Sequence, residues 1–190
     1  HNARQDNWAS NAEKERYRGR NHYNSHAYHS HSSYKQKGKQ DKKLHQIGLL
    51  FDRYRNKKMG QSEVRHLDHT ISAYEIHHDP ARVLAEYDGI LLANQDMNLN
   101  STHWAINNAK KNHSMEKFIN EIVPTSIKNR KNKLKNHEMQ LKGVGNDTPK
   151  DRHKRRILED KIQKDKEYIN SLESIDKKAM LKADKEARKT

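Results

Sequence analysis

Residues 64–113 decide the fold that we expect, and they read VRHLDHTISAYEIHHDPARVLAEYDGILLANQDMNLNSTHWAINNAKKNH. The stretch opens with residues of alternating polarity, which indicates a short strand ending at Asp68 and His69. Asn98 and Asn107 follow, nine positions apart. A carboxylate beside an imidazole, with two carboxamides further on, supplies the groups of a one-metal phosphodiesterase: oxygen ligands for a hard cation and a base for water. We therefore expect these four side chains to form one site.

At these positions the sequence resembles the HNH endonuclease family, in the variant that has Asp-His, then Asn, eight further residues, and a second Asn followed by basic residues. The matching segments are Leu67–Ile71, Asn98–Leu99 and Ile106–Lys111. The resemblance extends over about fifty of the 190 residues. It implies a ββα-metal fold, in which two strands and a helix surround one ion.

The resemblance also implies a role for each of four residues. Asp68 and Asn107 would bind the metal ion, His69 would be the general base, and Asn98 would fix the loop at the metal site. A site with one carboxylate and one amide oxygen favours Mg²⁺ or Mn²⁺.

The sequence departs from the family's pattern in three ways. Twenty-eight residues separate His69 from Asn98, more than compact members use, so we expect an insertion there. The chain has no cysteines, so it lacks the zinc-binding Cys pairs of many relatives and excludes disulfides. Asn107 stands where other subfamilies have a histidine, which again favours an oxygen-liganded ion.

A second register of the same motif stays open. Ile76–Asp79 reads IHHD, so His77 and His78 could form a histidine-rich site with Asn98 and with His103 or Asn107. Pro80 follows at once, however, and an Asp-Pro pair is typical of a helix start. We therefore favour the register at Asp68 and His69.

Four basic residues near the motif are candidates for contacts with substrate phosphates: Arg65, Arg82, Lys110 and Lys111. Three of them have an ordinary alternative. Arg82 could form a surface ion pair with a neighbouring acid. The two lysines could be the solvated end of a helix, where cations interact favourably with the helix dipole.

The composition favours a polyanionic partner. The net charge is +14 and the isoelectric point about 9.8, which predicts salt-dependent affinity for nucleic acid. With the HNH resemblance, we expect DNA more than RNA. A larger protein or guide complex could supply specificity. A non-catalytic basic protein of a ribosome, virion or other nucleoprotein particle fits the same charge, as does an HNH scaffold that has lost activity.

No apolar run in the sequence approaches the length of a membrane span, and the first residues contain no signal-peptide core. We therefore expect no membrane partner and an intracellular location, cytoplasmic or nucleoid-associated. Because the chain begins with His1, we expect a processed protein or part of a longer one.

We expect an α+β, mainly helical fold in three parts. Residues 1–38 are polar and rich in His and Tyr, which predicts a disordered, flexible basic arm that orders only on a partner. Residues 39–124 form the small ββα-metal nuclease core with flanking helices, beginning with an amphipathic helix over 39–58. Residues 125–190 form a basic C-terminal helical hairpin and a tail that frays beyond Ile175.

Within those parts, the sequence predicts three local features. Asp79 caps a short helix over 80–87 that Gly89 ends. Ser114 caps another helix, which Pro124 ends. Thr148 caps the second helix of the hairpin.

Overall fold

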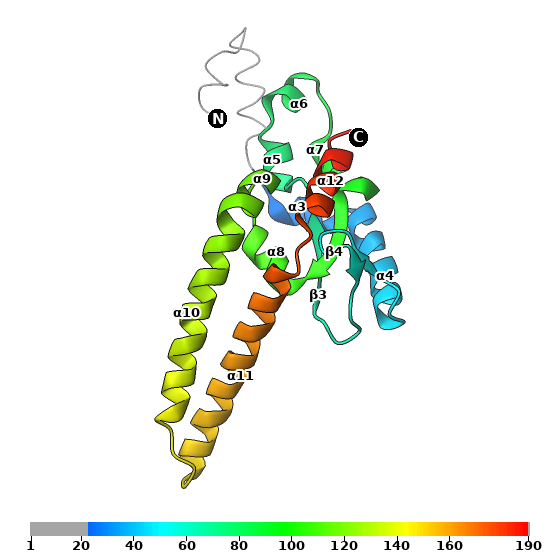
Figure 1. Ribbon diagram of the computed structural model, residues 1–190. Helices are drawn as coiled ribbons and strands as arrows, with labels where there is room; N and C mark the ends of the chain where they lie inside the picture. The colour runs from blue at the N-terminus through cyan, green and yellow to red at the C-terminus, as the bar shows by residue number, and fades with distance from the viewer. Residues whose placement is uncertain (1–22, 190) are drawn as a thin grey trace.

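The computed structural model describes residues 23–189 and shows a mainly helical α+β fold with two small antiparallel sheets (Figure 1). The helices are α3 (Ser25–Ser30), α4 (Ser32–Gln46), α5 (Ala73–His77), α6 (Pro80–Leu84), α7 (Gly89–Ala93), α8 (Trp104–Lys110), α9 (Met115–Lys117), α10 (Val123–Lys142), α11 (Pro149–Glu173) and α12 (Lys177–Ala187). The strands are β1 (Phe51–Asp52), β2 (Lys57–Lys58), β3 (Arg65–His69) and β4 (Leu99–His103). A 3₁₀ turn covers Asp96–Asn98, and a π-helical turn covers Phe118–Ile122.

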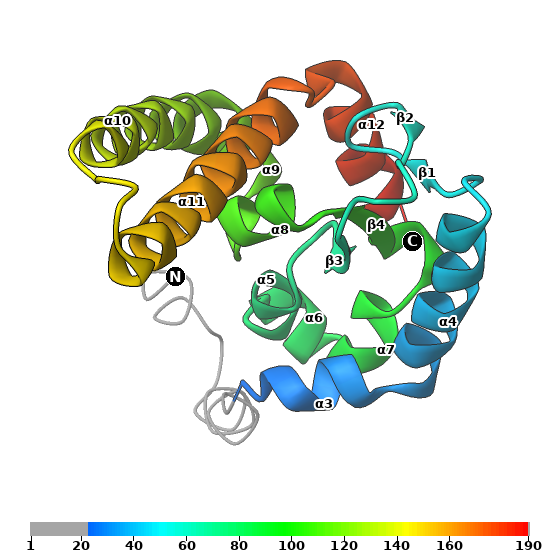
Figure 2. The same cartoon turned by 90° about the horizontal axis from the view of Figure 1, so that it is seen from below.

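The second sheet and the helix after it form a ββα unit. Strand β3 pairs antiparallel with β4, so that Asp68 lies opposite Asn100 and His69 opposite Leu99. Helix α8 follows β4 without a loop, and the imidazole of His103 caps it by accepting a hydrogen bond from the backbone N–H of Ala105. The predicted second strand after Asn98 and the helix that carries Asn107 are therefore confirmed (Figure 2).

The main core lies between the ββα unit and the C-terminal helices. Tyr54, Ile106, Phe118, Leu172 and Met180 are all buried there. The expectation that the chain frays beyond Ile175 is wrong, because α12 packs its apolar stripe into this core. Met180, Ala183 and Ala187 recur at helical spacing and are all buried. Its many charged residues hid this stripe in the sequence.

The N-terminal part differs from expectation. Residues 1–22 lie outside the described residues, but residues 23–38 are not a flexible arm, since they form α3 and the start of α4. Tyr28 is buried, and the Tyr34 hydroxyl donates a hydrogen bond to the Leu67 carbonyl. Aromatic side chains thus bury apolar surface in a segment that has almost no aliphatic residues, and the segment folds although its composition predicted disorder.

The predicted helix over 39–58 is also wrong in its bounds. Helix α4 begins at Ser32 and ends at Gln46. Gly48 follows with φ +72°, a conformation that glycine adopts without strain. Beyond it, β1 and β2 pair in a hairpin whose turn includes Asn56 at φ +52°.

The insertion between the two strands of the ββα unit holds α5, α6 and α7. Asp79 caps α6 by accepting from the backbone N–H of Ala81, as predicted, but the helix ends at Leu84. Gly89 begins α7 instead of ending a helix, because Asp88 is its N-cap. Within residues 23–189, none of the helices combines the length and the apolar composition that a membrane span requires.

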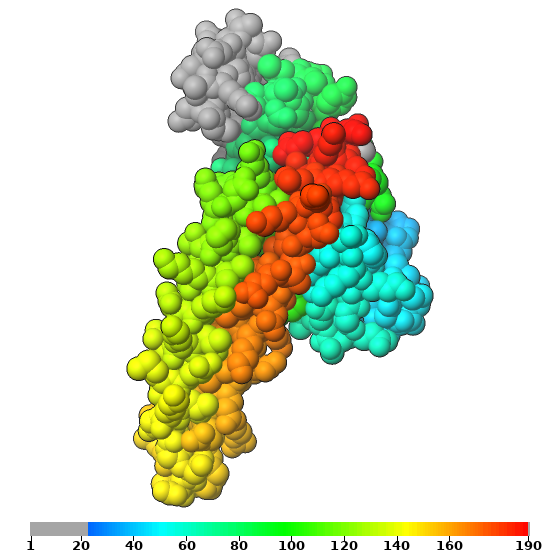
Figure 3. All heavy atoms as spheres, viewed as in Figure 1, coloured from blue at the N-terminus to red at the C-terminus, as the bar shows by residue number. Residues whose placement is uncertain are grey.

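The hairpin is confirmed, with α10 and α11 lying antiparallel and projecting away from the rest of the molecule (Figures 1 and 3). Ser114 and Thr148 are the predicted caps. Pro124 does not end a helix. It lies in the first turn of α10, where its missing N–H removes no helical hydrogen bond.

Candidate functional site

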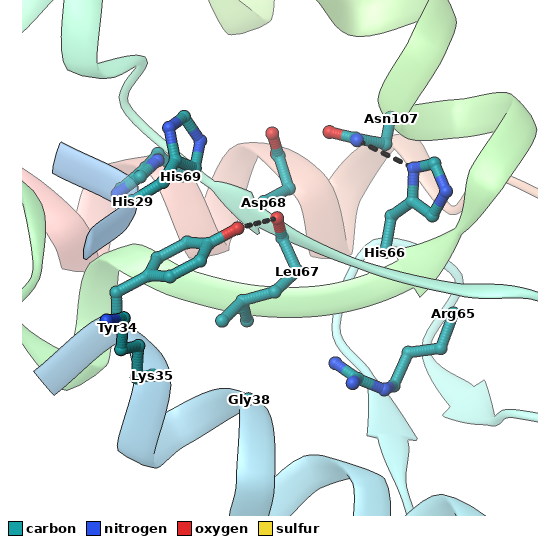
Figure 4. A pocket seen from close by; sticks show the side chains of 10 residues that line it. All are labelled: His29, Tyr34, Lys35, Gly38, Arg65, His66, Leu67, Asp68, His69 and Asn107. Carbon is teal, nitrogen blue, oxygen red and sulfur yellow. Dashed lines mark hydrogen bonds between the residues drawn. The ribbon is translucent and has the colours of Figure 1, made fainter. Parts of the chain in front are cut away.

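One cavity of about 430 Å³ brings together residues from the ββα unit and from the N-terminal helices (Figure 4). Its lining consists of His29, Tyr34, Lys35, Gly38, Arg65, His66, Leu67, Asp68, His69 and Asn107. The cavity thus contains three of the four motif residues, and α3 and α4 form part of its wall. Figure 2 shows β3 between α8 and α4.

Asp68 is held in place through one of its two carboxylate oxygens. The Tyr54 hydroxyl donates to Oδ2 at 2.7 Å, and the Lys110 ammonium lies 2.9 Å from the same oxygen. Among residues 23–189, nothing pairs with Oδ1, which leaves that oxygen available to a ligand in the cavity. The carboxylate is therefore oriented before any ligand arrives.

Lys110 has a different place from the one predicted. Its side chain is 0% exposed, and Nζ also donates to the His69 carbonyl at 2.8 Å. The prediction that Lys110 contacts substrate phosphate is wrong, because the ammonium is used inside the site to join Asp68 to the end of β3. Lys111 is exposed at the end of α8, where a phosphate can reach it.

His69 is buried and its imidazole is oriented by Asn94. Nε2 lies 2.9 Å from Asn94 Oδ1. Asn94 donates through Nδ2 to the carbonyls of Tyr28 and Ile90, so the atom that faces His69 is Oδ1, which can only accept a hydrogen bond. Nε2 of His69 therefore carries the proton, and Nδ1 keeps the lone pair that a general base needs.

The surroundings of His69 favour its neutral form. Burial lowers the pKa of His69 below its usual value, and the hydrogen bond to Asn94 opposes this shift only in part. The ring of Tyr34 stacks on the imidazole at a centroid distance of 5.3 Å, and His29 approaches it edge-on. An imidazole held neutral in this way can accept a proton near neutral pH.

Asn98 lies behind the site and fastens the segment that follows His69. Its Oδ1 accepts from the backbone N–H of Ile71 at 2.7 Å, and its Nδ2 donates to the carbonyls of Ile71 and Ala93. The side chain is buried and does not line the cavity. Its geometry is that of a residue that fixes a loop.

Asn107 reaches the cavity from α8. Its Nδ2 donates to Nδ1 of His66 at 3.0 Å, and burial lowers the pKa of His66, which favours the neutral acceptor. No hydrogen bond from residues 23–189 reaches the amide oxygen of Asn107, which is directed toward Asp68 in Figure 4. Two oxygens from β3 and α8 thus face the same space.

These oxygens fit a small hard cation. Mg²⁺ is usually bound by one or two protein oxygens and keeps several positions for water and phosphate. Asp68 Oδ1 and Asn107 Oδ1 provide that number. Between residues 23 and 189, no three His, Asp or Glu side chains gather as a metal site.

The other predicted residues are dispersed. Arg65 lines the cavity, with Nη1 donating to Ser101 Oγ at 3.1 Å, and remains accessible. Arg82 is buried and donates to three backbone carbonyls, so both predictions for it, a phosphate contact and a surface ion pair, are wrong.

The histidines of the alternative register do not converge on the cavity that holds Asp68. His77 is hydrogen-bonded to the Tyr28 hydroxyl and lines a separate cavity, and His78 packs against Tyr74. His103 is the cap of α8. The structure therefore brings together the Asp68 register and separates the other.

Sequence reasoning missed several residues of the site: Tyr34, Lys35, Tyr54 and Asn94. The only signal for Asn94 is a lone polar residue directly after the apolar run Ile90–Ala93. Tyr34 lies in a segment whose composition predicts disorder.

Comparisons of the chain with protein-family models, with curated proteins and with solved structures find no match.

Proposed function

We propose that this chain is a metal-dependent endonuclease of HNH type that hydrolyses phosphodiester bonds in nucleic acid, DNA in preference to RNA. One observation carries the proposal: Asp68, His69 and Asn107 line a single cavity on a ββα unit. Their chemistry, two free oxygens beside a neutral imidazole, is that of a one-metal hydrolytic site.

His69 acts on the attacking water. Nδ1 accepts the proton, while Asn94 holds the tautomer and the ring orientation. Because burial lowers the pKa of His69, the base stays neutral to a lower pH than a free histidine. The products are a 5′ phosphate and a 3′ hydroxyl.

The remaining residues of the site act on the phosphate. Asp68 and Asn107 would hold Mg²⁺ or Mn²⁺, which when bound would supply Lewis-acid stabilisation of the negative charge that develops on the leaving oxygen. Arg65 and Lys35 line the cavity and bind the neighbouring phosphates, and the exposed Lys111 at the end of α8 is a further candidate for such a contact. Lys110 and Tyr54 keep the Asp68 carboxylate oriented.

Cleavage of plasmid and single-stranded DNA tests the proposal. The chain is assayed with Mg²⁺, Mn²⁺ or EDTA, beside His69→Ala, the alternative-register variant His78→Ala, and His26→Ala as a control at an exposed histidine. We expect metal-dependent cutting that His69→Ala abolishes and that His78→Ala and His26→Ala retain.

Two results would contradict the proposal. Cutting that survives His69→Ala but not His78→Ala would move the site to the other register. Tight binding without cutting, on every substrate and with both ions, would favour the non-catalytic basic protein.

A further inference from the structure

Helices α10 and α11 form a long arm that the proposed catalytic site does not use. This helical arm, residues 123–173, projects from the molecule as two antiparallel helices (Figures 1 and 3). Helix α11 has 25 residues and, at 1.5 Å per residue, is about 37 Å long. The proposed catalytic site does not explain why the chain forms so long a projection.

The arm is stiff along its length. Leu158, Ile162, Ile169 and Leu172 of α11 are buried along the seam with α10. Asp165 interrupts this apolar row, and it is held by Nε of Arg130 at 2.7 Å and by Nδ1 of His137 at 2.6 Å. A buried polar cluster of this kind specifies one register between two helices.

The base of the arm is joined to the helix that carries Asn107. Helix α11 packs against α8, where the rings of Tyr168 and Trp104 lie 6.1 Å apart. The guanidinium of Arg130 covers the Tyr168 ring at 4.4 Å, and Leu172 belongs to the main core. The direction of the arm is therefore fixed relative to the cavity.

Positive charge is concentrated on the outer part of the arm. Residues 128–156 contain eleven Lys and Arg against three Asp and Glu, a net charge of +8 out of the +14 of the whole chain. This segment is less than a sixth of the sequence. Such density is what a polyanion recognises.

Four lysines of α10 form a row on one flank. Lys128, Lys131, Lys135 and Lys142 are spaced by three, four and seven residues, so they share one helix face, and all are exposed. Lys131 pairs with Glu173 at 3.2 Å. The other three have no ion pair within the described part of the chain. The row extends for about 21 Å.

We propose that the helical arm binds the phosphate backbone of a DNA duplex, so that the substrate must extend beyond the scissile phosphate by about the length of the arm. At 3.4 Å per base pair, 37 Å corresponds to about 11 base pairs. The proposal rests on the proposed function, because it assumes that the cavity takes a phosphodiester of the same duplex.

The stiffness of the arm argues for a duplex over a single strand. A duplex is straight over tens of base pairs and holds its phosphates at fixed spacing, as a fixed row of lysines requires. A flexible strand gains little from such a row. Single-strand binding proteins combine charge with aromatic stacking platforms, and the exposed surface of residues 128–156 contains no aromatic ring other than histidine.

Fluorescence anisotropy with the full chain in EDTA tests the proposal without cleavage. The arm variant changes Lys128, Lys131, Lys135 and Lys142 to Gln. The control variant changes the exposed Lys57, Lys58, Lys177 and Lys178 to Gln, for the same loss of charge. Probes are 30-base-pair and 10-base-pair duplexes and a 30-nucleotide single strand, over a series of salt concentrations, and circular dichroism checks folding.

We expect the arm variant to bind the long duplex at least about tenfold more weakly, with a salt slope lower by up to about 3.6, that is 0.9 for each phosphate that the four lysines no longer neutralise. The control variant should bind nearly as tightly as the wild type. The short duplex, about 34 Å long, cannot contact the cavity and the whole arm at once, so the difference between wild type and arm variant should be smaller on it than on the long duplex.

Three results would overturn the inference: equally weakened binding in the two variants, an equal effect of the arm variant on short and long duplexes, or a larger effect on the single strand. Failure of the nuclease proposal can be told apart from failure of this inference. If the chain cuts nothing with Mg²⁺ or Mn²⁺ but its binding depends on the arm and on duplex length, the arm proposal is supported and the nuclease proposal is refuted.

Discussion

Replacement of Lys110 by Met tests the reasoning about the site most directly. The substitution keeps most of the side-chain volume and removes the buried ammonium that joins Asp68 Oδ2 to the His69 carbonyl. Asp68 keeps the hydrogen bond from Tyr54 but loses its positive partner. The His69 carbonyl loses its side-chain donor.

The structure gives the size of the effect. At an effective dielectric constant of about 20, unit charges 2.9 Å apart attract each other by about 6 kcal/mol. Removal of one member of a buried ion pair typically costs about 3–5 kcal/mol of folding free energy. For a chain of this size, such a loss lowers Tm by roughly 6–20 °C.

Thermal and denaturant unfolding measure this change. Lys111→Met is the matched control, since the neighbouring lysine is exposed and should change the free energy of unfolding by less than about 0.5 kcal/mol. The double variant Asp68→Asn with Lys110→Met closes a mutant cycle. It should recover part of the loss, because no unpaired charge is left buried.

Equal stability of the Lys110→Met and Lys111→Met variants would refute the reasoning. So would a cycle in which the two single changes simply add. If Lys110→Met does not fold, the double variant still decides the matter, since it should fold where the single variant does not.

Three further predictions concern the site and its supports. Burial lowers the pKa values of His66, His69 and His103, so below about pH 6.5 the unfolded chain binds protons that the folded chain does not. The free energy of unfolding, measured with urea, should therefore fall as pH decreases from 7 toward 5, and a rise on acidification would contradict this prediction. Asn94→Ala should reduce kcat by about tenfold to a hundredfold with the fold retained, because His69 loses the acceptor that sets its tautomer. Asn94→Asp should raise the pH below which activity is lost, and an unchanged pH–rate profile would show that Asn94 does not orient His69. Arg82→Met should lower the free energy of unfolding by at least about 3 kcal/mol, because three backbone carbonyls lose their donor. Its affinity for duplex DNA should fall no more than that of Lys57→Met, and a selective loss of binding would show that Arg82 contacts phosphate after all.

The motif and the hairpin were predictable because their signals are local. Asp68 and Asn98 stand at or next to the ends of short elements, and Asn107 lies in the middle of a short helix. Thr148 with Pro149 marks a helix start without tertiary information. Pairing of β3 with β4 then follows from the two strands on either side of the insertion.

Residues whose roles depend on tertiary contacts were not predictable. Nothing in the sequence distinguishes Lys110, which is buried against Asp68, from Lys111, which is exposed one position later. Asn94 reaches His69 across 25 positions, and Tyr34 reaches Leu67 across 33. Helix α12 was missed because its apolar stripe is only three residues of small or flexible type among many charges.

The contacts of α3 and α4 change where the functional unit of this chain begins. The Tyr28 carbonyl accepts the hydrogen bond that fixes the Asn94 amide, and Tyr34 both stacks on His69 and binds the Leu67 carbonyl. A fragment cut at residue 39, where the polar composition ends, would keep every motif residue and lose the lining that aligns the base. The proposed hydrolytic domain thus depends on aromatic residues upstream of its motif, and a minimal version of it must include Tyr28 and Tyr34.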